Sequence, residues 1–567
     1  REIPVSVEVW DFALPVKSSM QTNFLHHWNN NYYEDVGISS KEMNRMVWEF
    51  FLDYRISGNY MFFIEYDGYG ADLENYVKSM KEFVDEHPEI THVQLLLHQW
   101  DYSGTVDSEA MANNKNNKYM YELLKKYGLT QIASYYVVDE PADTEANEKL
   151  IKDLAAGISG FAPDIKNIVT TNNSKYDGYI SCWCPLWNMI DKSFVAGKQA
   201  LGEHVWWYGC AVPAAPYPTY HLNDNLLSPR IVHWMQKDYG VEGELYWATT
   251  LFDYYKGGGN YVARDVWTNP YTSEGLPGDG YLCYPGKEGD GIIDDNVPVP
   301  TIRLEVMRDG MEDYEYLWLY EQKLNALIEK YNLDITADDA LQMFFAGLYK
   351  DTADWSLDTQ RLYYTREKLA ELITADDDFI CFLDANANEG VINIFTNGND
   401  TVKINGKIVN GENGRYKVNV TVDETLYLNE FTVSVGNKER TLFVFPDKLN
   451  AVETLVTVDG NETAIAAANK KAVVTATNGE ITAQLTEKGK YFDIPVSAMN
   501  TNVDLSEYTH IRMRISQNGS EMTDELIIGF RSSFSTYELT VEKTESGTYV
   551  DIPMTETFIN NALKKKP

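Results

Sequence analysis

Short apolar runs and amphipathic segments alternate along residues 1–375. The apolar runs have the length and composition of buried strands, and they fall at Val5–Trp10, Tyr60–Tyr66, His92–Trp100, Ile132–Val138, Asn167–Thr171, Tyr179–Leu186, His204–Gly209 and Gly243–Thr249. Positions with a helical period separate most of them, at Ser40–Tyr54, Leu73–Glu86, Ser108–Tyr127, Glu145–Gly160, Asp191–Ala200, Ser228–Tyr239 and Ile302–Leu324. Strands that alternate with helices predict an α/β fold, and eight such strands predict a (β/α)8 TIM-like barrel.

The pattern changes after the acidic triplet Asp376-Asp-Asp378. Short alternating strands then follow one another, with Asn-Gly turns that begin at Asn397, Asn405 and Asn410. This pattern is typical of all-β folds. We therefore predict a barrel domain over residues 1–375, a β-sandwich-like module over residues 376–446 and a second β-rich module over residues 447–567.

The chain is strongly acidic. Its 85 Asp and Glu residues outnumber its 48 Lys and Arg residues, so the formal net charge is −37. Nucleic acids and anionic membrane surfaces repel such a protein, and we expect neither as a partner. No apolar run reaches the roughly 18 residues that a membrane span requires, so we expect no membrane insertion.

Cysteine and histidine patterns predict neither a metal site nor a cofactor site. The five cysteines are few and odd in number, so no disulfide framework follows from them. Cys182 and Cys184 are separated by one residue, which is poor spacing for zinc. The sequence has no HExxH motif, no P-loop, no GxGxxG that opens a helix and no GxSxG. We therefore expect chemistry by side chains alone, with no metal and no cofactor.

The strand predicted at Ile132–Val138 runs directly into Asp139, Glu140 and Pro141. Two adjacent carboxylates are costly in a core, whereas the C-terminal ends of barrel strands are where catalytic groups lie. Neighbouring strand residues point to opposite faces. Both acids can therefore share a pocket only where the strand ends, and Pro141 supplies that ending. The alternative interpretation is a turn that caps the next helix near Thr144.

Aromatic side chains gather at the ends of two other predicted strands. The chain has 13 Trp and 39 Tyr, and Trp207, Tyr208, Tyr246 and Trp247 lie at or near such ends. Aromatic faces stack on the apolar face of a sugar ring, so these four are candidate substrate-binding residues, with core packing as the alternative. Arg303, in the first turn of the last predicted helix, is a further candidate for contact with a ligand hydroxyl.

A Gly-rich connection over residues 252–300 joins the last predicted strand to the last predicted helix. A connection of that length without regular structure is usually functional. It contains the segment Gly278–Gly286, which we expect to turn back over the pocket.

These segments together resemble one known family. The motifs are Val7-Glu-Val-Trp-Asp-Phe-Ala-Leu-Pro15, Val138-Asp-Glu-Pro141, Trp206-Trp-Tyr-Gly-Cys210, Gly243-Glu-Leu-Tyr-Trp247, Gly278-Asp-Gly-Tyr-Leu-Cys-Tyr-Pro-Gly286 and Ile302-Arg-Leu-Glu-Val-Met-Arg-Asp-Gly-Met-Glu-Asp-Tyr-Glu-Tyr316. In this order they look like the catalytic domain of glycoside hydrolase family 123. The resemblance implies a retaining, exo-acting β-N-acetylgalactosaminidase whose substrate is a glycan with terminal β-GalNAc. Together with the acidic composition, it also implies a secreted or cell-surface protein of bacterial type.

The resemblance further implies substrate-assisted catalysis, in which the 2-acetamido oxygen of the sugar attacks C1 and forms an oxazolinium ion. Two adjacent acids fit this mechanism better than the separate carboxylates, about 5 Å apart, of ordinary retaining glycosidases. Glu140 is then the general acid and base, and Asp139 orients the acetamide and stabilises the developing positive charge. By analogy with the family, Tyr208 donates to the acetamido oxygen and Trp247 forms an aromatic wall.

Two alternatives stay open from the sequence. A β-N-acetylglucosaminidase or a broad hexosaminidase would use the same barrel, because loop contacts distinguish the C4 epimers. A catalytically inactive glycan-binding protein would use the barrel as a scaffold, although the presence of both Asp139 and Glu140 weighs against it. We expect the C-terminal modules to be spacers or carbohydrate-binding modules.

Overall fold

In the computed structural model the chain forms two compact units, residues 1–449 and residues 450–567. In the first unit the structure describes residues 7, 9–26, 38–65, 72–97, 106–214, 216–256, 261–273, 276–286, 296–376, 378–386 and 389–446. In the second unit it describes residues 461–468, 473–477, 480–484, 494, 510–515, 526–531, 536–541 and 548–553.

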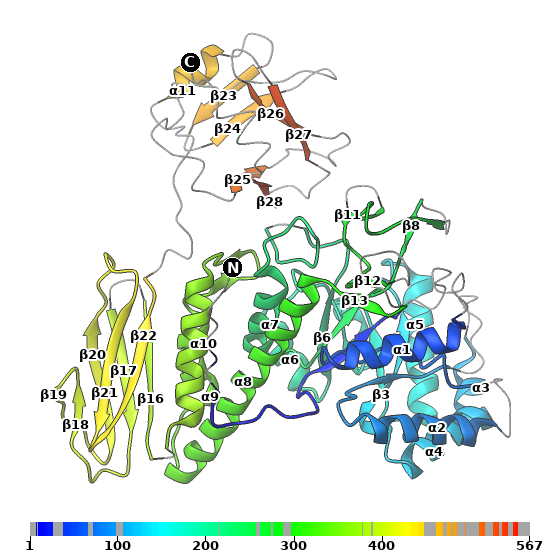
Figure 1. Ribbon diagram of the computed structural model, residues 1–567, viewed down its shortest axis with the longest axis horizontal. Coiled ribbons are helices and arrows are strands. Elements are labelled where there is room, and N and C mark those ends of the chain that lie inside the picture. Colours follow the sequence, from blue (N-terminus) through cyan, green and yellow to red (C-terminus); the bar gives the residue numbers. More distant parts are fainter. Residues whose placement is uncertain are drawn as a thin grey trace. The chain divides into compact units, whose positions relative to one another are not determined.

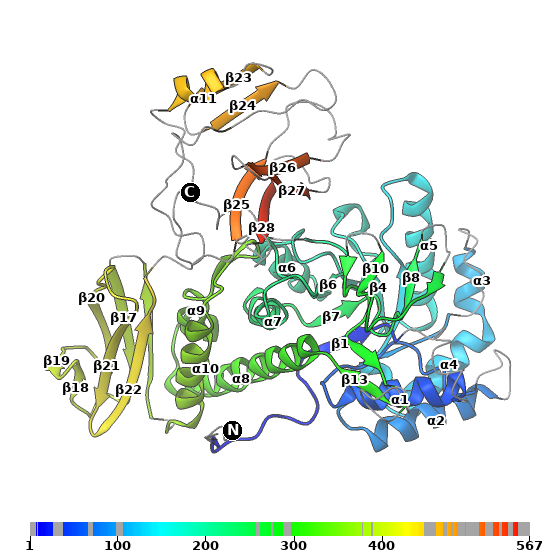
Figure 2. The same ribbon diagram turned by 45° about the horizontal axis from the view of Figure 1, so that its top comes forward.

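The centre of the first unit is a sheet of seven parallel strands (Figures 1 and 2). These are β1 Gln21–Phe24, β2 Val93–Gln94, β3 Ala133–Val138, β4 Lys166–Val169, β5 Cys182–Trp183, β6 His204–Gly209 and β7 Gly243–Tyr246. Their order across the sheet is β1-β7-β6-β5-β4-β3-β2. From β2 to β7 each strand therefore pairs with the next one in the chain, and β7 returns to β1, as in a barrel.

Residues 57–59 lie between the edge strands β1 and β2 and bring the sheet close to a closed barrel. The backbone N–H of Phe24 in β1 donates to the carbonyl of Ser57 at 3.1 Å. On the other side, the backbone N–H of Gln94 in β2 donates to the carbonyl of Asn59 at 3.2 Å. An extended segment without a strand ladder thus occupies the position that an eighth strand would take.

The first predicted strand, Val5–Trp10, is wrong. Val7 and Val9 are 78% and 87% exposed and belong to no strand, while Val5, Ser6 and Glu8 lie outside the described residues. The barrel opens instead with β1. This strand is polar inside the barrel, where the side-chain amide of Asn23 donates to Oε1 of Gln94 at 2.8 Å, so its sequence lacks the apolar signal of a buried strand.

The second predicted strand, Tyr60–Tyr66, is not a strand in its described part, residues 60–65. The other six predicted strands overlap β2 to β7. The structure therefore shows seven paired strands among the described residues, where we predicted eight.

Most helices surround the sheet, and the last two, α9 and α10, lie farther out beside α8 (Figure 1). They are α1 Ser40–Leu52, α2 Asp72–Glu86, α3 Ser108–Asn113, α4 Lys115–Lys126, α5 Glu145–Phe161, α6 Lys192–Gln199, α7 Ser228–Tyr239, α8 Ile302–Tyr331, α9 Ala337–Phe345 and α10 Thr359–Thr374, with short 3-10 turns at Thr130–Ile132 and Ser174–Tyr176. The helix predicted at Ser108–Tyr127 is two helices, because Asn114 leaves the helical conformation and caps α4 by accepting from the N–H of Asn116 at 2.8 Å.

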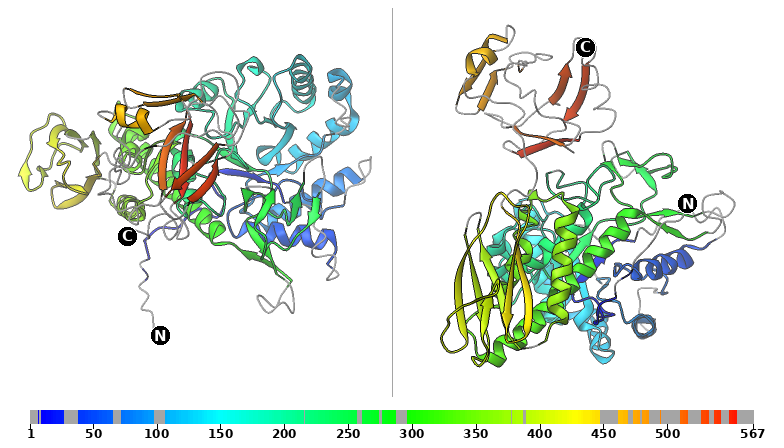
Figure 3. Two further views of the ribbon diagram at one scale, coloured as in Figure 1. Left: turned by 90° about the horizontal axis from the view of Figure 1, so that it is seen from above. Right: turned by 60° about the vertical axis from the view of Figure 1, so that its left-hand side comes forward.

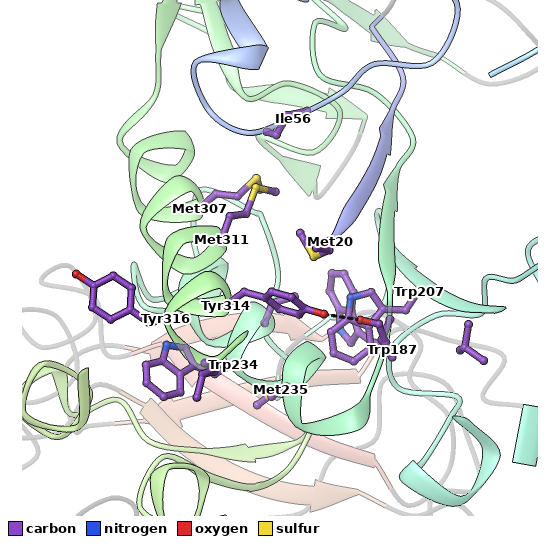
Figure 4. Packing of buried hydrophobic residues seen from close by; sticks show 14 of the residues in the cluster. Met20, Ile56, Trp187, Trp207, Trp234, Met235, Met307, Met311, Tyr314 and Tyr316 are labelled. Carbon is purple, nitrogen blue, oxygen red and sulfur yellow. Dashed lines mark hydrogen bonds between the residues drawn. The ribbon is translucent and has the colours of Figure 1, made fainter. Parts of the chain in front are cut away.

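Buried side chains form one cluster inside the barrel and a larger, outer cluster that lies between the barrel and its helices and continues into the strands after residue 380. The inner cluster consists of Ile168, Cys182, Cys184, Leu186, Trp206, Tyr208 and Leu245. Residues that alternate with these along the strands, such as Val169, Trp183 and Trp207, belong to the outer cluster. Figure 4 shows part of the outer cluster, including Met307 and Met311 of α8. Alternation along each strand therefore decides which side chains reach the barrel interior.

The Gly-rich connection over residues 252–300 contains regular structure, which corrects the expectation of an irregular loop. Its described part forms three two-stranded antiparallel sheets. They pair β8 Asp253–Tyr255 with β9 Tyr261–Ala263, β10 Tyr271–Ser273 with β11 Leu276–Pro277, and β12 Cys283–Pro285 with β13 Pro298–Pro300.

A β-sandwich follows α10 within the first unit, after a hairpin of β14 Tyr349–Asp351 and β15 Asp354–Trp355 that precedes α10. One sheet contains β16 Ile380–Ala385, β17 Glu389–Phe395 and β20 Arg415–Thr421. The other contains β19 Lys407–Ile408, β18 Val402–Ile404, β21 Asn429–Val435 and β22 Lys438–Val444. Figure 3 shows these strands in yellow beside the green helices. The sandwich packs on α9 and α10, since the ring of Phe443 lies 6.0 Å from that of Phe344 and 5.2 Å from that of Tyr364.

The second unit is rich in strands among its described residues. It contains α11 Glu462–Ala468 and three antiparallel pairs. These pair β23 Val473–Thr477 with β24 Glu480–Gln484, β25 His510–Ile515 with β28 Thr548–Pro553, and β26 Leu526–Arg531 with β27 Thr536–Val541. The predicted C-terminal β structure is thus confirmed at the level of its sheets.

Candidate active site

A β-bulge at the end of β3 turns Asp139 into the barrel. Tyr136 pairs with Ile168 of β4 and packs on the inner cluster. The register then shifts, so that Val138 pairs with Val169, a residue of the outer cluster. A bulge places two residues opposite one and resets the alternation of the strand. Asp139 consequently lies on the same side as Tyr136, whose hydroxyl donates to Asp139 Oδ1 at 2.6 Å.

Glu140 lies at the same open end of the barrel, where the strands have their C-terminal ends and which we call the mouth. It reaches the mouth by a change in backbone direction. Its φ angle is +39°, in the left-handed region that non-glycine residues seldom adopt and that is often found at functional sites. Its carboxylate accepts a hydrogen bond from the hydroxyl of Tyr208 at 2.6 Å. Tyr208 comes from the inner face of β6, three strands away from β3 in the sheet. Both acids are exposed to solvent at this mouth.

Thr170, which follows β4, connects the two acids. Its hydroxyl oxygen accepts the backbone N–H of Glu140 at 2.5 Å, and the hydroxyl donates to Asp139 Oδ1 at 3.5 Å. Thr170 is itself buried. One side chain thus holds the strained backbone of Glu140 and contacts the carboxylate of Asp139.

The two tyrosines are fixed as hydrogen-bond donors. Burial raises the pKa of Tyr136 well above its usual value, and the charge of Asp139 adds to this shift. Burial likewise raises the pKa of Tyr208, together with its hydrogen bond to Glu140. Both phenols therefore keep their protons at neutral pH and present O–H groups to the two carboxylates.

Trp247 lies just beyond β7 and packs on the outer cluster. Its ring is half-buried, and its Nε1–H donates to Oδ1 of Asp279 at 2.9 Å. The aromatic wall assigned to Trp247 stays a prediction.

Trp207 and Tyr246 are not brought to the mouth as substrate-binding residues. Trp207 is fully buried in the outer cluster (Figure 4), and its ring centroid lies 6.2 Å from that of Trp187. Tyr246 is also buried in the outer cluster, where its ring lies 5.7 Å from that of Phe24. The physical reason is strand alternation: each is the neighbour of an inward-facing residue and so points outward.

Arg303 is not open to a ligand either. It is 3% exposed, and its guanidinium donates to backbone carbonyls of Tyr220, Gly278 and Tyr281, the last at 2.9 Å. Its position at the start of α8 therefore lets it tie the 278–281 turn to the segment before α7. The sequence shows the charge but not these carbonyls, so we predicted a ligand contact.

Three residues absent from the sequence-based candidates contact the predicted ones: Tyr136 and Thr170 contact the acids, and Asp279 accepts a hydrogen bond from Trp247. Tyr136 precedes Asp139 by three positions, and only the bulge brings the two side chains to one side. Thr170 directly follows a predicted strand next to β3, so the meeting of parallel strand ends is the signal that could have found it. Asp279 stands between two glycines, where a Gly-Asp-Gly turn is the signal.

Among the described residues, no group of three or more His, Cys, Asp or Glu side chains is arranged to hold a metal ion. In the same part of the chain, no helix combines the length and the apolar character that a membrane crossing requires.

Comparison with known proteins first identifies the class of protein to which the barrel belongs. A parallel barrel with paired carboxylates at the C-terminal ends of its strands is a common enzyme architecture, and the matching family makes this domain a glycoside hydrolase. Residues 71–320 match the family described as glycoside hydrolase 123, catalytic domain. This match confirms the predicted family resemblance over residues 71–320. No curated protein matches the chain.

Solved structures with detectable likeness include a family 123 glycoside hydrolase from Clostridium perfringens, which was studied for glycolipid glycan hydrolysis. It is 14% identical, with a TM-score of 0.41, over 64% of this chain and 70% of that chain. An FMN-binding beta-glucuronidase from Facaelibacterium prausnitzii L2-6 is 9% identical, with a TM-score of 0.29, over 77% and 57% of the two chains. A putative beta-galactosidase from Bacteroides fragilis is 11% identical, with a TM-score of 0.27, over 78% and 58%.

Proposed function

We propose that the barrel domain is a retaining, exo-acting β-N-acetylgalactosaminidase that removes terminal β-GalNAc from glycans by substrate-assisted catalysis. The observation that carries the proposal is the placement of Asp139 and Glu140. They are consecutive in sequence, both exposed at one barrel mouth, and each accepts a hydrogen bond from a different tyrosine. The choice of β-GalNAc comes from the family match over residues 71–320.

The placement of the two acids favours a nucleophile that belongs to the substrate. Ordinary retaining glycosidases hold an acid and a nucleophile on opposite sides of the scissile bond, about 5 Å apart. Asp139 and Glu140 both come from the end of β3 and both contact Thr170, so they approach the sugar from one side. The 2-acetamido oxygen of the substrate can then attack C1 from the other side.

The reaction has two steps in this proposal. In the first, Glu140 protonates the glycosidic oxygen, the bond from C1 to that oxygen breaks, and the acetamido oxygen forms a bond to C1. Asp139 accepts a hydrogen bond from the acetamide N–H and stabilises the positively charged oxazolinium ion. In the second, a water molecule attacks C1, Glu140 takes its proton, and the acetamide is released. Trp247 lines the sugar, and Tyr208 orients Glu140 for both proton transfers. The hydroxyl of Tyr208 donates its single proton to Glu140, so donation to the acetamido oxygen, the role that the family resemblance implies for Tyr208, is not part of this proposal.

The test is hydrolysis of paired 4-nitrophenyl β-glycosides of GalNAc and GlcNAc, with the first-formed product followed by proton NMR. We expect the GalNAc glycoside to be cleaved about tenfold faster or more, and the first free sugar to have the β configuration. A GalNAc-derived thiazoline, which imitates the oxazolinium ion, should inhibit at least about a hundredfold better than GalNAc.

Other outcomes would reject the proposal in distinguishable ways. An α-configured first product excludes attack by the acetamide. Faster cleavage of the GlcNAc glycoside identifies a β-N-acetylglucosaminidase. Binding of GalNAc without hydrolysis of either glycoside identifies an inactive glycan-binding protein.

Thr170 should act as a positioning residue for this reaction. Thr170→Val keeps the shape but leaves the N–H of Glu140 without its acceptor, so we expect kcat to fall about 10–100-fold while KM changes little. Thr170→Ser restores the hydroxyl and should recover most of kcat. A purely structural role for Thr170 predicts a lower melting temperature for Thr170→Val, with kcat retained in the folded enzyme.

A further inference from the structure

A cavity of about 690 Å³ lies between the C-terminal end of α8 and the β-sandwich. This volume is typical of sites that hold small molecules. Figures 1 and 2 show the end of α8 on the side of the sandwich strands. The 30 residues of α8 span about 45 Å, and its first turn contacts the segment that follows β7, through Arg303 and Tyr281. The cavity is therefore separate from the mouth and its acids.

One wall of the cavity is a hairpin turn with a fixed backbone. The N–H groups of Glu412 and Arg415 each donate to the carbonyl of the other at 3.0 Å. Asn413 and Gly414, which lie between them, have φ angles of 52° and 75°, as a two-residue hairpin turn requires. The carbonyl of Gly414 also accepts the N–H of Thr396 at 2.8 Å, which ties the turn to the end of β17. The side chains around this turn thus start from a rigid frame.

The opposite wall comes from the end of α8. The half-buried ring of Tyr331 lines the cavity, and its hydroxyl donates to the carbonyl of Asp378 at 2.8 Å. Nη2 of Arg415 donates to the carbonyl of Asn332, the C-cap of α8, at 3.3 Å. These contacts fix the helix end against the sandwich, so both walls belong to one folded unit.

Two cations of the cavity have no anionic partner among the described residues. Arg415 and Lys417 alternate along β20, an edge strand, so both point to one face of the sheet. Both are exposed. Arg415 donates to a backbone carbonyl only, and no acceptor for Lys417 Nζ lies in the part of the chain that the structure describes. Of the acidic side chains in that part, Glu412 alone lines the cavity.

This local excess of positive charge stands in contrast to the chain as a whole, whose formal net charge is −37. A concave surface of one sign concentrates ligands of the opposite sign. Arg415 and Lys417 offer charged donors to one face, and charged donors bind carboxylate and sulfate oxygens more strongly than neutral donors do. The cavity therefore favours a ligand that carries an anionic group.

The remaining polar groups of the lining require more than an anion. The carboxylate of Glu412 accepts hydrogen bonds and repels a bare anion, whereas a hydroxyl can donate to it. The exposed amides of Asn410 and Asn413 can bind hydroxyls as donors or as acceptors. The ring of Tyr331 adds an apolar surface. A ligand with an anion, several hydroxyls and an apolar ring face satisfies all of these groups.

We propose that this cavity binds an acidic sugar unit, that is, a sugar with a carboxylate or a sulfate group. The anion lies at Arg415 and Lys417, the hydroxyls contact Glu412 and the amides of the turn, and the ring lies against Tyr331. The inference goes beyond the proposed function and does not depend on the activity of the barrel. It gives the first β-sandwich a glycan-binding site of its own.

The test is isothermal titration of the whole chain with four probes: glucuronic acid, galactose 6-sulfate, galactose and inorganic sulfate. None of them has the 2-acetamido group on which the proposed reaction depends, so the result is independent of that reaction. We expect both acidic sugars to bind about tenfold or more tighter than galactose and than inorganic sulfate. Higher salt should weaken their binding, because the cations are exposed.

Lys417→Gln should weaken binding of both acidic sugars about tenfold. Its melting temperature should stay that of wild type, because Lys417 is exposed on an edge strand. The matched control is Lys407→Gln. Lys407 is exposed on β19 of the other sheet, outside the cavity lining, and this variant should bind as wild type does.

Four results overturn the inference, and three of them need only wild type, so they hold even when a variant fails to fold. Absence of binding by every probe rejects the site. Equal affinity for galactose and the acidic sugars shows that no anion is recognised. Inorganic sulfate that binds as tightly as the acidic sugars shows that the hydroxyls contribute nothing. Equal losses in Lys417→Gln and Lys407→Gln show a general effect of charge.

Discussion

Glu140→Gln should lower turnover of a natural β-GalNAc glycan by about two to four orders of magnitude. The substitution removes only the transferable proton, because the amide oxygen of glutamine can still accept the hydrogen bond that Tyr208 donates at 2.6 Å. Aryl glycosides with activated leaving groups should lose much less in the first step, since their leaving groups need little protonation. The measurement is kcat on a natural glycan and on a 4-nitrophenyl glycoside with the same enzyme preparation.

Glu145→Gln provides the matched control for this variant. Glu145 is exposed at the start of α5, five positions further along the chain, and its substitution should leave turnover unchanged. Near wild-type turnover of the natural glycan by Glu140→Gln would remove Glu140 from the mechanism.

Asp139→Asn should lower turnover by about two to three orders of magnitude, a loss of roughly 3–4 kcal/mol of transition-state stabilisation. Asparagine keeps the shape and can still accept the hydrogen bond from Tyr136, but it lacks the charge that stabilises the oxazolinium ion. Folding should change little, because the cap of α5 is Thr144, whose hydroxyl oxygen accepts the N–H of Asn147 at 3.2 Å. The check is kcat and melting temperature on the same sample.

The control for this variant is Asp143→Asn. Asp143 is exposed and pairs with Lys175, and a surface ion pair of this kind contributes little to the free energy of unfolding. An Asp139→Asn enzyme that melts at a lower temperature but turns over normally would contradict the role given to Asp139.

The sequence pattern was sufficient for most helices of the barrel and for the end of the strand that precedes the paired acids, because both depend on local signals. Helical periodicity marks α1, α2 and α5 to α7 close to their observed bounds and marks the start of α8, which continues to Tyr331, whereas α9 and α10 were not predicted. An apolar run that ends in Asp139, Glu140 and Pro141 marks the end of a strand. The polar strand β1 was missed because its interior contacts, such as Asn23 with Gln94, are long-range.

The arrangement around the acids depends on backbone details that composition does not encode. The bulge before Val138 and the positive φ of Glu140 decide that the two carboxylates share one mouth. The same limitation explains why the sequence did not show which aromatic candidates point into the barrel. Trp207 and Tyr208 are neighbours in sequence, but only Tyr208 points into the barrel, and the assignment of faces requires the register of β6 with β7.

The gap between the edge strands β1 and β2, which residues 57–59 fill, is the part of the barrel without a strand ladder. There, one isolated parallel bridge between Phe24 and Gly58 joins residues 57–59 to β1, and the N–H of Gln94 donates to the carbonyl of Asn59 on the side of β2. Ser57 adds hydrogen bonds with Thr22 and Thr91. Local opening motions of a folded protein are concentrated where the backbone has the fewest hydrogen bonds. The groups assigned to the chemistry come from the ends of β3, β4, β6 and β7, and the strand pairing runs without a break from β3 through β4, β5 and β6 to β7. The distance between β1 and β2 can therefore change without a break in the pairing that holds the reactive groups.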